Sequence, residues 1–141
     1  MKYPILAMAV VAASLAANAA QDTTVEDVAL TIWTEARGES FESRRFVASV
    51  IWNRAKGDTT QLSAVCRAPK QFSAWNKGRP VAIRRNAKDE AIWRECLAFG
   101  KAMARGEFEP CTDATHFCTN NPQWSKTMNL VKRIGKMKFY V

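Results

Sequence analysis

The sequence predicts a mainly helical α+β domain with a small loop or hairpin lobe, and three features of the chain carry this prediction. Apolar residues recur at three- and four-residue steps in several stretches, the period of a helix that buries one face. Residues 68–80 interrupt this pattern with prolines, a glycine and scattered aromatic residues. The tail, residues 137–141, has the composition of a strand.

The first predicted helix runs from about Thr24 to Arg37. Its apolar stripe consists of residues three or four positions apart: Val25, Val28, Ala29, Ile32, Trp33 and Ala36. Thr23 or Thr24 can cap its start, and Asp27 suits a first turn. We expect Gly38 to end the helix, because glycine readily takes the left-handed conformation found just past helix ends.

Glu35 lies on this apolar stripe, three residues after Ile32. The spacing predicts a carboxyl group in the last turn that faces protein rather than water. Desolvation disfavours the charged form of a carboxyl group, and a protonated one can act as a general acid toward a glycosidic oxygen. The competing interpretation is an ion pair at the helix end with Arg37 or Arg44, since structural ion pairs also perturb acids.

Two further long helices follow. Ser40 can cap a second helix that ends near Gly57, and a short helix is predicted over residues 61–66. The second helix has an apolar inward face: Phe46, Val47, Val50 and Ile51. The longest helical pattern covers residues 86–105 and ends at Gly106. Its inward face is made of Ala91, Ile92, Cys96, Phe99 and Met103.

The C-terminal third is less regular. Residues 107–121 are expected to be irregular and to carry the segment Thr115-His116-Phe117. Proline suits the first position of a helix, so Asn121-Pro122 predicts another short helix. Trp124, Met128 and Val131 would anchor that helix in the core.

The N-terminus has the pattern of a secretory signal peptide over residues 1–19. A short positive start precedes an apolar run, and Ala17-Asn18-Ala19 is a small-x-small cleavage pattern near Ala19. The mature chain, residues 20–141, would then be one domain exported to the periplasm or cell wall. The apolar run is shorter than the ~20 residues of a membrane-spanning helix, so no stable membrane insertion is expected. A signal that stays attached as a releasable anchor is the alternative.

The exported part holds four cysteines. An even number in an oxidising compartment predicts two disulfides. Of the three possible pairings, we favour Cys66–Cys96 together with the local loop Cys111–Cys118. A zinc site is the weaker interpretation, because the chain has no C-x-x-C pair and His116 is its only histidine. Neither a metal nor another cofactor is expected.

The formal net charge of +8 suits an exported protein that works on an anionic surface such as a bacterial wall. Nucleic acid is the usual competing partner of a basic chain. The sequence contains no recognisable nucleic-acid-binding motif, and a signal peptide would take the protein away from nucleic acid.

Five segments in order along the mature chain resemble a known family: Thr34–Glu39, Val50–Arg54, Gln71–Trp75, Ala114–Phe117, and Trp124 with Phe139-Tyr140. In these segments the chain is similar to the SleB-type cell wall hydrolases, the spore cortex-lytic and related peptidoglycan hydrolases. The resemblance implies a lysozyme-like fold and cleavage of the bond between N-acetylmuramic acid and N-acetylglucosamine. Glu35 falls on the family's catalytic glutamate. The chain departs from the family pattern at Asp113 and Cys118.

The chemistry expected of Glu35 depends on whether a second acid is present. Hydrolysis with a separate nucleophile or base needs another carboxylate ~5–9.5 Å away. Glu39 is the nearest candidate, but Gly38 interrupts the helix between them. A lytic transglycosylase needs only one glutamate, because the 6-hydroxyl of the muramic sugar attacks its own anomeric carbon. The alternatives are a muramidase that uses water and a catalytically silent wall-binding protein on the same scaffold.

The remaining site predictions concern substrate contacts on peptidoglycan glycan strands, on which the protein is expected to act as a monomer. Gln71 and Ser73 are expected to bind acetamido groups, and Trp75 to stack on a sugar ring. A local plug of the core is the alternative for Trp75. Thr115 and His116 are expected to line the opposite wall; a loop histidine bonded to backbone is the alternative for His116. Glu39 and Arg37 are expected to support the site by ordering the loop. The other tryptophans, Trp124 included, are expected in the core.

Overall fold

The computed structural model describes the backbone of residues 4–141 and the side chains of residues 15–141. Its helices are α1 (Pro4–Ala36), α2 (Phe41–Arg54), α3 (Leu62–Arg67) and α4 (Ala87–Ala104). Short 3₁₀ helices are η1 (Thr59–Gln61), η2 (Ser73–Trp75) and η3 (Gln123–Thr127). The strands are β1 (His116–Cys118), β2 (Leu130–Ile134) and β3 (Met137–Tyr140). The prediction of a mainly helical fold is therefore confirmed.

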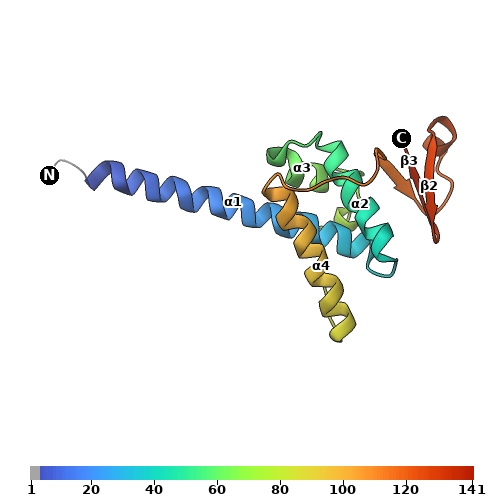
Figure 1. The fold of residues 1–141 in the computed structure, drawn as a ribbon, viewed down its shortest axis with the longest axis horizontal. Helices are drawn as coiled ribbons and strands as arrows, with labels where there is room; N and C mark the ends of the chain where they lie inside the picture. Colours follow the sequence, from blue (N-terminus) through green and yellow to red (C-terminus); the bar gives the residue numbers. More distant parts are fainter. Residues whose placement is uncertain (1–3) are drawn as a thin grey trace.

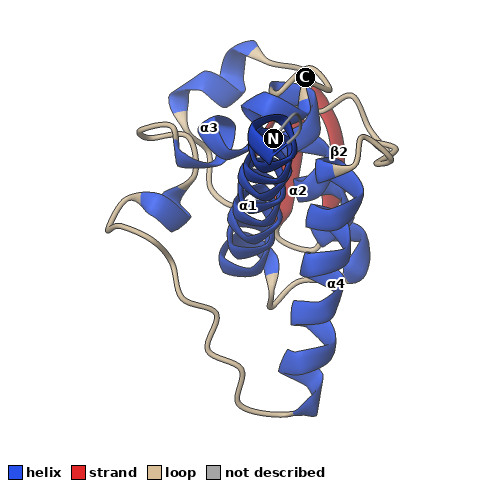
Figure 2. Cartoon of the chain, turned by 90° about the vertical axis from the view of Figure 1, so that its left-hand side faces the viewer, coloured by secondary structure: helices blue, strands red, loops and turns tan. Residues whose placement is uncertain are grey.

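The second half of α1 is the central element of the core, whereas its first half projects away from the other helices (Figure 1). Val28, Ala29 and Ile32 are fully buried, as the apolar stripe predicts. The helix lies between α3 and α4 and also contacts α2 (Figure 2). A Cβ atom on Gly100 of α4 would lie 2.5 Å from the Val25 carbonyl oxygen, so α4 reaches α1 because that position has no side chain.

The predicted start of the first helix is wrong, whereas its end lies one residue before the predicted Arg37 but lacks the expected left-handed glycine. The helix does not begin at Thr24: the Thr23 and Thr24 hydroxyls donate to carbonyl oxygens one turn earlier, at 3.0 and 3.1 Å. Asp27 is therefore not in a first turn and is instead fully buried. The helix ends at Ala36, and Gly38 is not among the glycines with positive φ. A tight turn closes this end, in which the Glu39 N–H donates to the Ala36 carbonyl at 3.1 Å.

The predicted signal peptide is only partly described. Residues 1–3 lie outside the described residues, and the backbone of residues 4–19 forms the start of α1. Its removal near Ala19 stays a prediction. Among the described residues, no helix combines the length and the apolar character needed to cross a membrane.

The starts and ends of α2 and α4 agree with the sequence. Ser40 caps α2 by accepting the Ser43 N–H at 3.1 Å, and Asn86 caps α4 by accepting the Asp89 N–H at 2.8 Å. Gly57 and Gly106 follow these helices with φ near +70°, the left-handed conformation that favours glycine. The predicted inward face of α2 is buried throughout.

The C-terminal region forms a small antiparallel sheet in the order β1-β3-β2. Its register pairs His116 with Tyr140 and Phe117 with Phe139. The tail is thus a strand, as its composition predicts. Residues 68–80, the other place where a hairpin was considered, form a loop around η2 instead. The prediction that Val131 anchors a helix is wrong, because Val131 lies exposed in β2.

Both predicted disulfides are wrong: Cys66, Cys96, Cys111 and Cys118 are free thiols, none within disulfide distance of another. Cys66 and Cys96 are buried, but α1 lies between the helices that carry them. The Cys111 thiol packs against the Ser49 hydroxyl of α2 at 3.4 Å, whereas the Cys118 thiol donates to the Asn120 carbonyl at 3.2 Å. The short sequence separation of the second pair therefore does not bring its sulfur atoms together.

Candidate active site

Glu35 lies in the last turn of α1 and is half-buried, facing the loop that contains η2. The Ser73 hydroxyl donates to Glu35 Oε1 at 3.0 Å, and the Ala74 N–H donates to the same oxygen at 3.1 Å. These two donors hold the carboxyl group in one orientation. Arg37 lies over the Trp33 ring, 5.6 Å from its centroid, and Arg44 pairs with Glu95, so both arginines are engaged elsewhere.

An open cleft of about 490 Å³ lies beside Glu35, and we call it the Glu35 cleft. Its lining is mostly polar and comes from the end of α1, the end of α2, the η2 loop and the C-terminal region. The lining residues are Glu35, Arg54, Lys70, Gln71, Ser73, Asn76, His116, Phe117, Cys118, Thr119, Asn120, Pro122, Trp124 and Met137. Glu35 is the only carboxylic acid among them.

The wall opposite Glu35 is aromatic. The centroid of the His116 ring lies 5.1 Å from that of the Trp124 ring. Trp124 and Tyr140 pack edge to face, with their ring centroids 5.5 Å apart. The Thr115 hydroxyl lies 3.0 Å from His116 Nδ1. Burial is the main cause that lowers the pKa of His116 below its usual value, and the charge of Arg54 lowers it further. Both effects favour the neutral form of the His116 ring.

Asn53 and Arg54, at the end of α2, connect the two walls. The Asn53 amide donates to the carbonyls of Thr112 and Ala114, each at 2.8 Å. Arg54 Nε donates to the Thr115 carbonyl at 2.6 Å, while its guanidinium lies 4.8 Å from the Phe72 ring centroid. Burial lowers the pKa of Arg54, and the charge of Glu35 opposes that effect.

The structure brings four of the predicted site residues together in the Glu35 cleft: Glu35, Gln71, Ser73 and His116. Thr115 lies just behind the wall, where it contacts His116 and Arg54. Glu39 lies outside the cleft and pairs with Lys136 at 3.4 Å.

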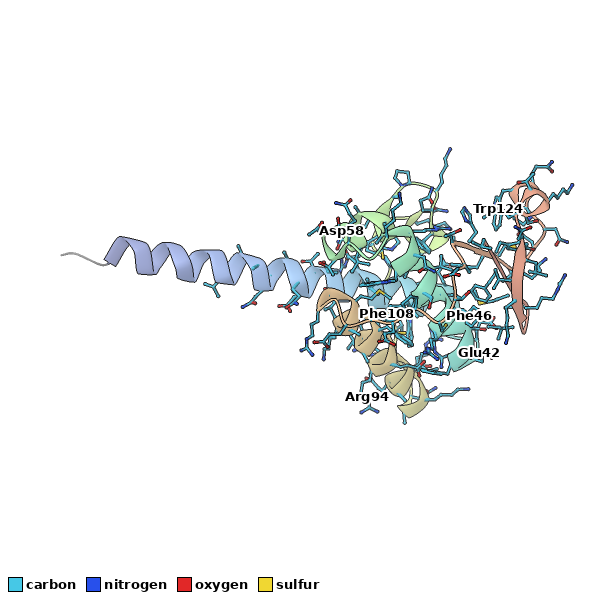
Figure 3. The ribbon with its side chains drawn as sticks, turned by 45° about the horizontal axis from the view of Figure 1, so that its top comes forward. Glu42, Phe46, Asp58, Arg94, Phe108 and Trp124 are labelled. Carbon is cyan, nitrogen blue, oxygen red and sulfur yellow. The ribbon has the colours of Figure 1, made fainter. Side chains whose placement is uncertain are left out.

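The structure places Trp75 outside the Glu35 cleft, packed against the core, and places Trp124 in the cleft rather than in the core. The Trp75 indole N–H donates to Thr31 at 2.9 Å, and its ring borders a separate hollow beside Arg67 rather than the Glu35 cleft. Trp124, expected in the core, is half-buried and lines the cleft. Figure 3 shows it beside the sheet, apart from the core residues Phe46 and Phe108.

Sequence reasoning did not assign Trp124 or Arg54 to the site. The adjacent Asn53-Arg54 pair carried a signal, because two polar residues end an otherwise apolar helix face. Trp124 belongs to the segments that resemble the family, but its place in the cleft depends on how the C-terminal sheet packs. Within the part of the chain that the structure describes, no group of three or more histidine, cysteine or acidic residues is placed to hold a metal ion.

An open polar and aromatic cleft with a glutamate on its wall can hold a sugar chain and place an acid beside it. The family model of the cell wall hydrolases matches residues 38–140, a match that begins just after Glu35. The chain therefore belongs to the cell wall hydrolase family and is a peptidoglycan hydrolase.

Two solved structures show the same fold. One is the catalytic domain of the Bacillus cereus SleB protein, with a TM-score of 0.60 and 22% identity over 85% of this chain and 91% of that chain. The other is the catalytic domain of the germination-specific lytic transglycosylase SleB from Bacillus anthracis. Its TM-score is 0.61, with 22% identity over 84% of this chain and 94% of that chain. The search among curated proteins gave no match.

Proposed function

We propose that this protein is an exported lytic transglycosylase that cleaves the bond between N-acetylmuramic acid and N-acetylglucosamine, with Glu35 as both general acid and general base. Membership in the cell wall hydrolase family supports peptidoglycan as the substrate. The Bacillus anthracis structure with the same fold is described as a lytic transglycosylase, which favours that reaction here.

The observation that carries this proposal is that Glu35 is the only carboxylic acid lining the cleft. A glycosidase with a separate nucleophile or base places a second carboxylate ~5–9.5 Å from the acid. Glu39, the nearest acid in the sequence, does not line the cleft and pairs with Lys136. A single acid favours a reaction in which the nucleophile is a hydroxyl of the substrate itself.

The proposed reaction has two proton transfers through one carboxyl group. Glu35 first donates its proton to the glycosidic oxygen, and the bond to the anomeric carbon of the muramic sugar breaks. The 6-hydroxyl of the same sugar then attacks that carbon and loses its proton to the Glu35 carboxylate. The products are a 1,6-anhydro sugar and a free glycan end, and the enzyme regains its starting protonation without consuming water.

The contacts around Glu35 suit this double role. Both donors reach Oε1, from Ser73 and from the backbone of Ala74, which leaves Oε2 to exchange the proton with the glycan. We propose that Gln71 and Ser73 contact acetamido groups on one wall of the cleft. On the opposite wall, Trp124 offers an aromatic face for a sugar ring, and Thr115 holds the His116 ring beside it.

The test is the Glu35→Gln variant, assayed by mass spectrometry of the fragments released from purified peptidoglycan. We expect anhydro-muropeptides from the parent protein and no release from the variant, with an unchanged melting temperature. Glu42→Gln is the matched control, because Glu42 is an exposed helical acid outside the cleft and should keep full activity. A folded, fully active Glu35→Gln variant would contradict the proposal.

The same measurement separates the alternatives. Products heavier by one water would identify a muramidase, and binding to walls without soluble fragments would identify a silent wall-binding protein. Export is tested separately, by locating the processed chain in the periplasm or wall fraction of cells that produce it.

A further inference from the structure

Three polar residues of α1, Asp27, Thr31 and Glu35, are four positions apart and therefore lie in one line along the helix. We call them the polar stripe. All three contact residues 67–79, the segment that runs from the end of α3 through η2. Two members of the stripe, Asp27 and Thr31, are fully buried, although the proposed reaction uses neither of them.

Asp27 binds two arginines of that segment. Arg67 donates to both carboxylate oxygens, at 2.7 and 2.8 Å, and Arg79 donates to Oδ1 at 3.0 Å. A fully buried carboxylate is costly unless it is paired and hydrogen-bonded, and these contacts meet that need. Both guanidinium groups also lie over the Trp75 ring, 4.9 and 5.9 Å from its centroid. Asp27 therefore fixes the two cations that hold the indole.

Thr31 holds the same indole by its polar edge. The Thr31 hydroxyl donates to the Asp27 carbonyl at 2.7 Å, which directs a lone pair of its oxygen toward the segment. The Trp75 N–H donates to that oxygen at 2.9 Å. Two successive turns of α1 therefore fix Trp75: Asp27 acts on the ring through the two arginines, and Thr31 accepts the indole N–H.

Ser73 and Ala74, the two donors to Glu35, directly precede Trp75 in η2. A shift of Trp75 therefore moves both donors relative to the Glu35 carboxyl group. We propose that Asp27 and Thr31 are positioning residues: through Arg67, Arg79 and Trp75 they place η2 so that its donors orient Glu35. This inference rests on the proposed function, since it concerns the residue that the reaction requires.

The test compares two substitutions at one position. Thr31→Val keeps the shape of the side chain but removes the acceptor, and Thr31→Ser keeps the acceptor but removes the methyl group. We expect kcat on peptidoglycan fragments to fall about tenfold in Thr31→Val with KM within twofold, and to return to near the parent value in Thr31→Ser. A residue needed only for packing would show the reverse order. Thr23→Val, which alters an exposed threonine of the same helix, should change nothing.

A second measurement does not depend on catalytic activity. Amide hydrogen exchange measured by NMR should be faster for the Ala74 N–H in Thr31→Val than in the parent, and unchanged for core amides of α2. If Thr31→Val does not fold, Trp75→Phe removes the same hydrogen bond from the other side and should give the same result.

Parent values of kcat and of Ala74 exchange in a folded Thr31→Val variant would overturn the inference. That outcome is distinct from failure of the proposed function, which would appear as activity in Glu35→Gln.

Discussion

Replacing Ser73 by alanine tests whether the donors of the η2 loop orient the acid. The Ser73 hydroxyl donates to Glu35 Oε1 at 3.0 Å, and the Ala74 N–H, which the substitution leaves in place, donates at 3.1 Å. Hydrogen bonds to charged groups contribute about 1.5–3 kcal/mol. Because Ser73 is exposed, water can take part of its role, so we expect a loss of about 1.4 kcal/mol, or about tenfold in kcat.

The assay is the initial rate of fragment release at several substrate concentrations, so that kcat and KM are separated. The free energy of unfolding, measured by urea titration, should change by no more than about 0.5 kcal/mol, as is usual when an exposed residue is replaced. Ser63→Ala is the matched control, because Ser63 donates a long bond of 3.4 Å to Thr24 and lies outside the cleft.

Two results would refute the reasoning for Ser73. An unchanged kcat with a raised KM would show that the hydroxyl only binds the sugar and does not orient Glu35. A lower kcat accompanied by a large loss of stability would show that the substitution disturbs the loop as a whole.

Three further predictions concern stability and the thiols. Gly100→Ala should lower the free energy of unfolding by about 1–3 kcal/mol in a urea titration, because its Cβ would lie 2.5 Å from the Val25 carbonyl oxygen; unchanged stability would contradict the close packing of α1 and α4. Burial and the charge of Arg54 lower the pKa of His116. Below pH ~6.5 the unfolded chain therefore binds more protons than the folded one, and the free energy of unfolding decreases as the pH is lowered. His116→Gln should therefore lose less stability than the parent between pH 7.5 and about pH 5, and an equal loss would contradict this assignment. Burial raises the pKa of the Cys66 and Cys96 thiols to about 12, so both should react slowly with a thiol reagent at pH 8; all four cysteines should react in denaturant without a reductant, and fewer would reveal a disulfide.

The helices follow from the sequence because a helix is defined by contacts within a few residues. The stripe of α1 predicted its buried face, the cap at Ser40 predicted where α2 begins, and the helical pattern of residues 86–105 predicted the extent of α4. The same local reasoning failed at Gly38, because a turn closed by the Glu39 N–H ends the helix without a left-handed residue.

The position of Glu35 at the end of a buried stripe was visible in the sequence, and so was the short polar loop that supplies its two donors. The polar stripe of Asp27, Thr31 and Glu35 was also present in the sequence, at a regular four-residue spacing. The role of the stripe was not visible in the sequence. An acid in the first turn of a helix and a buried acid paired with two distant arginines, as Asp27 is, can have the same local sequence.

Contacts between segments far apart in the chain were decided only by tertiary structure. The sequence alone determined the helical architecture, the strand at the tail and the acid at the end of α1, because these depend on local periodicity and local hydrogen bonds. Packing of the sheet against the helices decided that Trp124 lines the cleft, and packing of the η2 loop against α1 decided that Trp75 anchors that loop. Packing of α3 and α4 against α1 keeps Cys66 apart from Cys96. Such outcomes depend on the relative placement of whole elements, which no repeat or spacing in the sequence encodes.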